Sequence, residues 1–155
     1  MVATASVAEI PSQTIDKEQA LFDWALTNPF LTDRLMFDFL DAHDGSCSIA
    51  PVASARAVKA YINGSAIKEY TFALQVTLAV SNAQDNINVQ NMYTLRKWQD
   101  WIEEQAKAQV YPDFGEKCQM MKLENVGNMP GMAQRFEGGT AKYQFFAKLT
   151  YLEVD

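Results

Sequence analysis

The chain has few of the residues from which most enzyme sites are built. Its 155 residues include a single histidine, His43. A Ser-His-Asp or Cys-His arrangement would have to use this residue, which lies in an Asp-rich segment typical of a solvated turn. The sequence has no Walker loop and no GxGxxG motif, and Gly138-Gly139-Thr140 is too short to cradle phosphates. We therefore expect no enzymatic activity, no catalytic residue and no cofactor.

Metal-ligand patterns are missing from the sequence as well. The two cysteines, Cys47 and Cys118, have no CxxC spacing, so we expect two reduced, half-buried thiols in a cytoplasmic product. Asp38, Asp41 and Asp44 do not follow the EF-hand pattern, which requires a glutamate at its twelfth position. A polar turn between strands explains these aspartates, and no metal site is predicted.

Long basic and long apolar runs are also lacking. The net charge is -6 at pH 7, and no run of Lys or Arg is longer than Arg96-Lys97. Proteins that hold nucleic acid usually present a basic face, because counterion release from phosphates supplies most of the affinity. No apolar run reaches the roughly 18 residues of a membrane span. The composition therefore predicts neither specific nucleic-acid binding nor membrane insertion.

The length of 155 residues fits one compact domain. Residues 1–14 lack the basic and continuous apolar regions of a secretory signal. We expect these residues to form a flexible N-terminal arm, followed by a single domain over residues 15–155.

Two segments alternate apolar and polar side chains with the period of a β-strand, residues 66–81 and 141–154. Asn63-Gly64 predicts a type I′ turn that joins the first of them to a strand over residues 56–62. Residues 88–108 instead have apolar side chains at helical spacing, which predicts an amphipathic helix. We expect its Trp98 and Ile102 to form the sheet–helix core with Leu74 and Val76.

The remaining elements have weaker signals. A helix is predicted from Asp16 to the Asn28-Pro29 pair, and strands over 34–40, 47–52 and 118–126. A helix over 34–40 is the competing interpretation. Residues 127–139 are predicted to be a long loop. The element order α-β-β-β-β-α-β-β indicates an α+β fold, a mostly antiparallel sheet with two helices packed on one face.

Five side chains are candidates for subunit or partner contacts. Tyr93 and Trp101 lie off the apolar stripe of the predicted helix, and aromatic residues are enriched at interfaces. Met129, Met132 and Phe136 place apolar groups in the predicted loop. Ordinary surface positions remain the alternative for the two aromatic residues of the helix.

Several segments together resemble one family. They are "CSIAPV", "VKAYINGSAIKEYTFAL", "NINVQNMYTLRKWQDWIEEQ" and "AKYQFFAKLTYLEV", in this order along the chain. Their order and aromatic positions resemble small phage proteins catalogued as minor capsid or tail-terminator-like (tail completion) proteins, some of which have an antibiotic-resistance label. The resemblance covers roughly Leu21 to Val154. The segments "LTDRLMFDFLDAHDG" and 127–139 match this family poorly.

The resemblance implies a virion structural protein with no catalytic motif. Subunits of such proteins form a ring, commonly six-fold, at the head-proximal end of the tail tube. The implied partners are other copies of the chain, the major tail tube protein and the head connector. The implied location is the virion tail or neck, and the host cytoplasm during assembly. DNA would pass through the ring, whose lumen we expect to be acidic or neutral.

Two other interpretations stay open at this point. The first is another neck protein, such as a head-completion or connector component. The second is a small-molecule-binding protein or enzyme that uses the concave face of the sheet.

Overall fold

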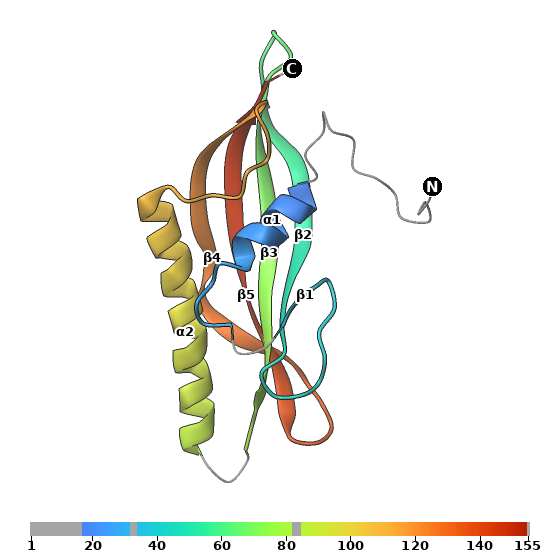
Figure 1. The fold of residues 1–155 in the computed structure, drawn as a ribbon, viewed down its shortest axis with the longest axis vertical. Coiled ribbons are helices and arrows are strands. Elements are labelled where there is room, and N and C mark those ends of the chain that lie inside the picture. The colour runs from blue at the N-terminus through green and yellow to red at the C-terminus, as the bar shows by residue number, and fades with distance from the viewer. Residues whose placement is uncertain (1–16, 32–33, 82–84, 155) are drawn as a thin grey trace, which may run out of the picture.

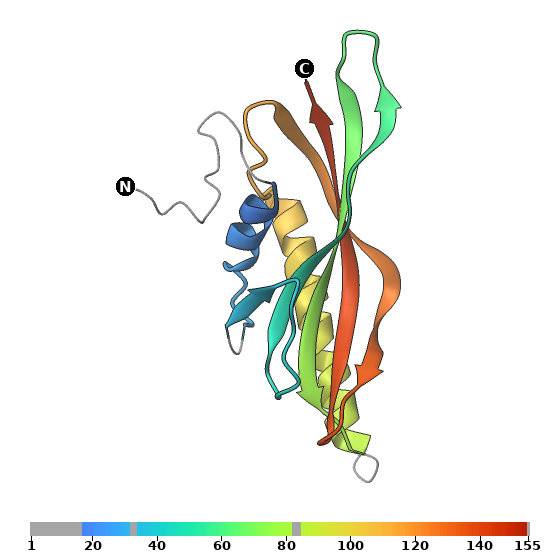
Figure 2. The same cartoon turned by 90° about the vertical axis from the view of Figure 1, so that its right-hand side faces the viewer.

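The computed structural model describes residues 17–31, 34–81 and 85–154. Its elements are α1 (Lys17–Ala25), β1 (Leu35–Phe37), β2 (Cys47–Ala60), β3 (Ala66–Ala79), α2 (Asp85–Ala108), β4 (Cys118–Arg135) and β5 (Thr140–Glu153). The strands form one sheet in the order β1-β2-β3-β5-β4. β1 is parallel to β2, and the other three pairs are antiparallel. Both helices lie on the same face of the sheet (Figures 1 and 2). The predicted α+β class is confirmed.

The centre of the sheet is a regular two-stranded ladder. β3 and β5 pair without a register shift from Ala66↔Glu153 to Ala79↔Thr140. Every second side chain of β5 is buried from Ala141 to Tyr151. The predicted strands 66–81 and 141–154 match these two strands to within two residues at each end, because alternation on a half-buried ladder is directly visible in the sequence.

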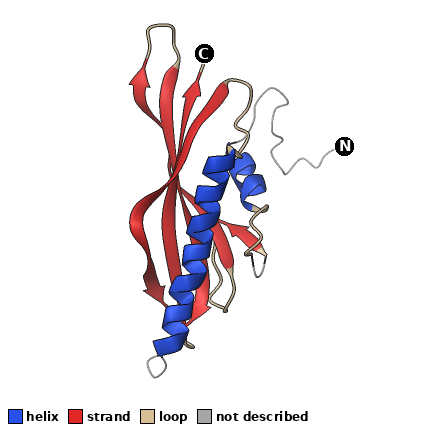
Figure 3. Ribbon diagram, turned by 90° about the vertical axis from the view of Figure 1, so that its left-hand side faces the viewer, coloured by secondary structure: helices blue, strands red, loops and turns tan. Residues whose placement is uncertain are grey.

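Helix α2 covers this ladder on one side. Its Leu95, Trp98 and Ile102 are almost completely buried and belong to one apolar cluster with residues of β3 and β5. Leu74 and Val76 lie in the same cluster, so the predicted sheet–helix core is confirmed. Figure 3 shows α2 running lengthwise along the sheet beside the shorter α1.

Helix α1 packs on the same core through Leu21, Trp24 and Ala25. The indole Nε1 of Trp24 donates a hydrogen bond to the Val110 carbonyl at 3.0 Å, which connects α1 to the segment after α2. The helix ends before the Asn28-Pro29 pair, as expected. Its predicted start at Asp16 and the arm over residues 1–14 lie outside the described residues.

The first part of the sheet differs from the prediction. The expected strands 47–52 and 56–62 are one strand, β2, so the sheet has five strands instead of six. Pro51 does not end the strand, because three register shifts along β2 absorb extra residues against β3. β1 has only three residues instead of the predicted seven, since Asp38 takes a φ of 54° that interrupts the extended backbone.

The predicted loop over 127–139 is wrong for residues 127–135, and only residues 136–139 form a turn. β4 extends to Arg135, and residues 131–135 pair with β5. Between the pairs Val126↔Phe146 and Gly131↔Gln144, β4 advances five positions while β5 advances two. Gly127, with a φ of 84°, begins this large bulge. The glycines and the proline that indicate a loop in the sequence form a bulge inside a strand instead.

The β2–β3 turn has another geometry than the predicted type I′. Tyr61 and Ser65 are paired through a 2.9 Å hydrogen bond, and the Gly64 N–H donates to the Tyr61 carbonyl at 3.1 Å. Gly64 has a φ of 90°, whereas Asn63 is not among the described residues with positive φ. The loop therefore has three residues and a left-handed glycine, the bulged alternative to the two-residue turn. Asn63 contributes its side chain, which accepts the Ser65 N–H at 3.1 Å.

Candidate functional site: exposed apolar surfaces

Trp101 cannot serve as the predicted partner contact, because it is only 3% exposed. Its ring packs against Trp24, with centroids 4.8 Å apart and planes tilted by 38°. The prediction placed it beside the apolar stripe of α2. The stripe is wider than expected, since α1 covers this side of the helix and buries the indole.

Tyr93 does lie on the surface of α2 and is 60% exposed. The ammonium group of Lys97 lies 4.6 Å from the centroid of its ring and 5.8 Å from that of Phe30. A partner contact through Tyr93 remains a prediction, because an exposed aromatic ring beside a lysine is compatible with solvent.

The candidates Met132 and Phe136 lie on the β4–β5 hairpin, whereas Tyr93 lies on α2. Met132 is 49% exposed on the outer strand β4. Phe136 is half-buried and begins the turn, where its N–H donates to the Thr140 carbonyl at 2.9 Å. The side chain of Met129 lies outside the described residues. The four candidates whose side chains are described therefore do not form one exposed site, since Trp101 is buried and the others lie on two different elements.

The loop between β1 and β2, residues 38–46, brings the side chains of Asp41, His43 and Ser46 together. The Ser46 hydroxyl lies 3.0 and 3.1 Å from the two ring nitrogens of His43, and the nearest Asp41 oxygen lies 3.8 Å from Nδ1. In a catalytic relay the hydroxyl faces one nitrogen and the carboxylate faces the other. Here one hydroxyl faces both nitrogens, and Ser46 is 0% exposed. The geometry therefore does not support a nucleophilic role for Ser46.

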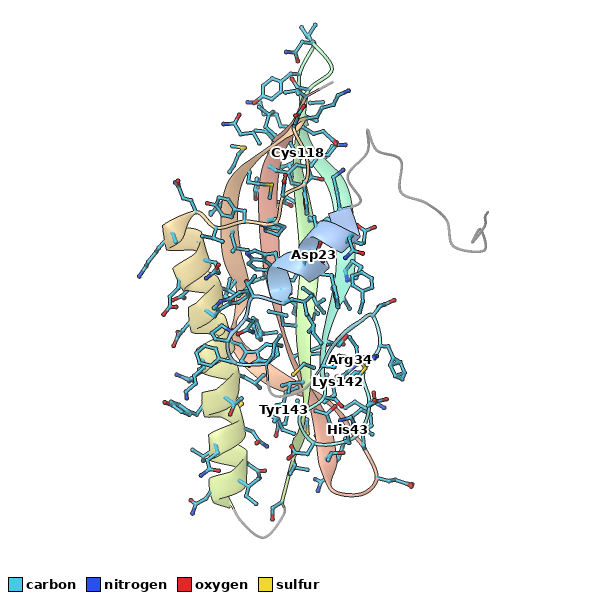
Figure 4. The ribbon with its side chains drawn as sticks, in the orientation of Figure 1. Asp23, Arg34, His43, Cys118, Lys142 and Tyr143 are labelled. Atoms are coloured by element: carbon cyan, nitrogen blue, oxygen red, sulfur yellow. The ribbon has the colours of Figure 1, made fainter. Side chains whose placement is uncertain are left out.

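Hydrogen bonds to the sheet explain why this loop is ordered. The Thr77 hydroxyl donates to the Asp41 carbonyl at 2.6 Å, and the Thr140 hydroxyl donates to the Ala42 carbonyl at 2.6 Å. The Gly45 N–H donates to the Thr77 carbonyl at 2.7 Å. These bonds hold the loop against β3 and β5, close to one end of the sheet, where Figure 4 labels His43. The loop thus has a structural role.

A second polar cluster surrounds the end of β5. Glu153 forms ion pairs with Lys68 of β3 and with Lys17 of α1, the latter at 3.3 Å. The hydrogen bond from Lys68 is the main reason why the pKa of Glu153 is lowered. The Cys118 thiol lies 3.5 Å from the same carboxylate, and burial together with this negative charge raises its pKa. A raised pKa makes a reactive thiolate at Cys118 unfavourable. Neither cysteine forms a disulfide. Cys118 is half-buried as expected, whereas Cys47 is fully buried.

An apolar hollow lies at the β1 edge of the sheet, and sequence analysis did not find it. It has a volume of about 440 Å³. We name it the β1 groove, and its lining residues are Phe22, Leu26, Arg34, Leu35, Met36, Phe37 and Phe39. Phe37 and Phe39 are 38% and 58% exposed. The apolar side chains of residues 35–40, interrupted by Asp38, are a signal for this surface, but their sequence pattern predicts a strand with two apolar faces.

A second exposed apolar surface is the end of the β2–β3 hairpin. We name it the hairpin tip, and it consists of Val58, Tyr61 and Ile62. Their exposed fractions are 58%, 41% and 108%, respectively. Figures 1 and 2 show this hairpin at one extremity of the molecule, beside the C-terminal end of β5.

The chain matches no protein-family model and no curated protein. Within the described ranges, no three His, Cys, Asp or Glu side chains are grouped so that they could hold a metal ion. No helix in the same ranges is both long and apolar enough to cross a membrane.

Proposed function

We propose that this protein is a phage virion structural protein of the tail-terminator type. Its copies form a ring at the head-proximal end of the tail tube and join the tube to the head connector. The phage assignment is supported by the four ordered sequence segments that resemble this family. The structural observation that carries the proposal is the presence of two separate exposed apolar surfaces, the β1 groove and the hairpin tip.

Two different surfaces on one subunit are what a ring requires. A contact between unlike surfaces is heterologous, and repeated copies of such a contact close into a ring or extend into a helical filament. Bulges along β2 and β4 make continuous strand pairing between subunits unfavourable. Side chains, instead of the sheet edges, are therefore expected to supply most of the subunit contacts.

The protein's location in particles tests the proposal. Tails assembled by a mutant of the parent phage that makes no heads should contain this protein at one end, visible by antibody labelling in electron micrographs. Recovery only with heads from a tail-less mutant would instead support the rival assignment as a head-completion or connector protein. Absence from heads, tails and complete virions would overturn a virion role.

Charge supports a ring through which DNA passes without binding. The net charge of -6 makes tight binding to phosphates unfavourable. We expect fluorescence anisotropy near physiological salt to detect no tight binding to double-stranded DNA. Tight binding under these conditions would contradict the acidic or neutral lumen.

A further inference from the structure

We infer that the hairpin tip of one copy inserts into the β1 groove of the next copy. This inference rests on the proposed function, because it assigns the contact that builds the ring. It identifies the partner as a second copy of this chain and the contact as heterologous.

The hairpin tip exposes more apolar surface than its turn requires. Ile62 is fully exposed at the second position of a turn whose backbone is fixed by Gly64 and by the Asn63 side chain. Turns of this kind accept polar residues at that position. The fold of the isolated subunit therefore provides no contact for Ile62, and burial against another chain would remove its surface from water.

The β1 groove has the size and chemistry to receive these side chains. Its volume of about 440 Å³ lies within the range of pockets that hold whole small ligands. Three phenylalanines line it, and the rings of Phe22 and Phe37 meet edge to face with centroids 6.2 Å apart. Aromatic side chains in a hollow are typical of the energetically dominant part of an interface.

The two surfaces cannot meet within one chain. The hairpin tip lies at one extremity of the molecule, whereas β1 lies beside the opposite half of the sheet (Figures 1 and 2). β1 pairs with β2 at Cys47 to Ile49, and the turn follows the other end of β2 at Ala60. A tip that occupies the groove must therefore come from another copy.

Charges beside the two surfaces are complementary. Asp23 of α1 lies between the lining residues Phe22 and Leu26 in the sequence, and Asp38 lies between Phe37 and Phe39. Arg34 is the one charged residue among the lining residues, and it offsets one of these two acidic charges. At the hairpin, the Lys59 ammonium lies 5.3 Å from the centroid of the Tyr61 ring. A lysine beside the inserting ring thus meets a rim with an excess of acidic groups.

Ring closure adds a geometric consequence. Neighbouring subunits of a ring are related by rotation alone, so the tip and the groove that it fills have the same height along the ring axis. Within one subunit the two surfaces are separated mainly along the long axis of the molecule. That long axis therefore lies across the ring axis instead of along it.

Complementation between two defective variants tests the contact directly. Ile62→Asp places a charge on the hairpin tip, and Phe39→Asp places a charge in the β1 groove. Both side chains are exposed, so the fold should tolerate either substitution. By analytical ultracentrifugation, each variant alone should remain monomeric at concentrations where the unmodified chain assembles. Their mixture should form one-to-one dimers, since one intact tip and one intact groove remain. Val89→Asp, at a position 66% exposed on α2, is the matched control and should assemble normally.

The outcomes distinguish this inference from the proposed function. Rings from Ile62→Asp with the protein still found at tail ends would overturn the contact and leave the function standing. Loss of assembly in both variants, with the unmodified protein absent from virions, would support the contact and overturn the virion function. An unmodified chain that stays monomeric at every concentration reached would overturn the inference, as would a mixture that forms no dimers.

A charge exchange gives a second, smaller effect. Lys59→Glu and Asp23→Lys should each weaken self-association by about two- to fivefold, the range for exposed ion pairs. The double variant should recover the original affinity, because the exchanged charges again attract. Additive weakening in the double variant would overturn the proposed pairing of Lys59 with Asp23.

Discussion

The centre of the sheet and its outer strands are built differently. β3 and β5 pair over their whole length without a register shift, whereas β2 and β4 each contain three shifts against the strand beside them. The central pair carries the buried ladder, and α2 lies over β4 and this ladder and contacts β4 most closely. The outer strands end near the exposed hairpin tip and the solvent-facing Met132. The regular pair carries most of the buried strand residues described, so we expect it to supply most of the stability, whereas the irregular strands also present the exposed surfaces.

This difference shows how an open sheet can have long edges without open-ended strand pairing. An unpaired regular strand is a template for further strands, and bulges or proline interrupt that template. β4 has Pro130 within its largest bulge, and β2 has Pro51 at its first register shift. Association through defined side-chain surfaces is then favoured over uncontrolled edge-to-edge growth.

The largest expected effect tests whether the centre supplies the stability. Leu74→Ala should lower the free energy of unfolding by about 2–5 kcal/mol, because Leu74 is 1% exposed and its loss leaves a cavity. Met132→Ala on β4 is the matched control and should change it by less than about 0.5 kcal/mol. Urea denaturation measures both. Equal losses would mean that the outer strand is as important to the core as the centre.

A smaller effect tests whether glycine imposes the large bulge of β4. Gly127 has a φ of 84° and open space where a Cβ would lie. Gly127→Ala should therefore cost about 1–2 kcal/mol from backbone strain alone. Gly127→Asn should cost less in the same thermal or urea melts, since asparagine tolerates positive φ better. A neutral Gly127→Ala substitution would show that the bulge does not require this backbone conformation.

The smallest effect concerns the ion pairs at the end of the central ladder. Lys68 and Lys17 hold the pKa of Glu153 below its ordinary value. A lowered folded-state pKa gives stability that is present above the unfolded pKa of about 4.3 and is lost as the pH falls through the folded pKa. Glu153→Gln should therefore cost about 0.5–1 kcal/mol at pH 7 and progressively less below about pH 4.

Glu137→Gln, in the exposed β4–β5 turn, is the control for this pH dependence. It should leave the stability unchanged within about 0.5 kcal/mol. A cost for Glu153→Gln that stays constant from neutral to acidic pH would contradict a role for the ionised carboxylate.

The same contrast explains which parts of the fold are predictable from sequence. In β3 and β5 every second residue faces the core, so their period identifies both strands almost to the residue. In β2 and β4 each bulge inverts the alternation, and Gly127 and Pro130 resemble loop residues locally. The pairing partner that makes these segments strands is distant in the sequence. Local patterns cannot reveal it.

The candidate contact surfaces were less predictable still. The prediction that Tyr93 lies outside the apolar core is correct. The same prediction is wrong for Trp101, because its burial depends on Trp24 of α1, which is distant in the sequence. The β1 groove combines α1 with residues 34–39, and neither segment alone indicates a hollow. The sequence places Ile62 beside the predicted Asn63-Gly64 turn. Its complete exposure follows only from the three-residue turn geometry.

Amide hydrogen exchange on the monomer and on the assembled ring tests the central claim most directly. The account predicts that residues 35–39 and 58–64 gain protection on assembly, since the β1 groove and the hairpin tip become buried. The central ladder, residues 70–78 and 143–151, should keep the high protection that it already has in the monomer. Unchanged exchange at 58–64, or new protection confined to β4, would contradict the assignment of subunit contacts to these two surfaces.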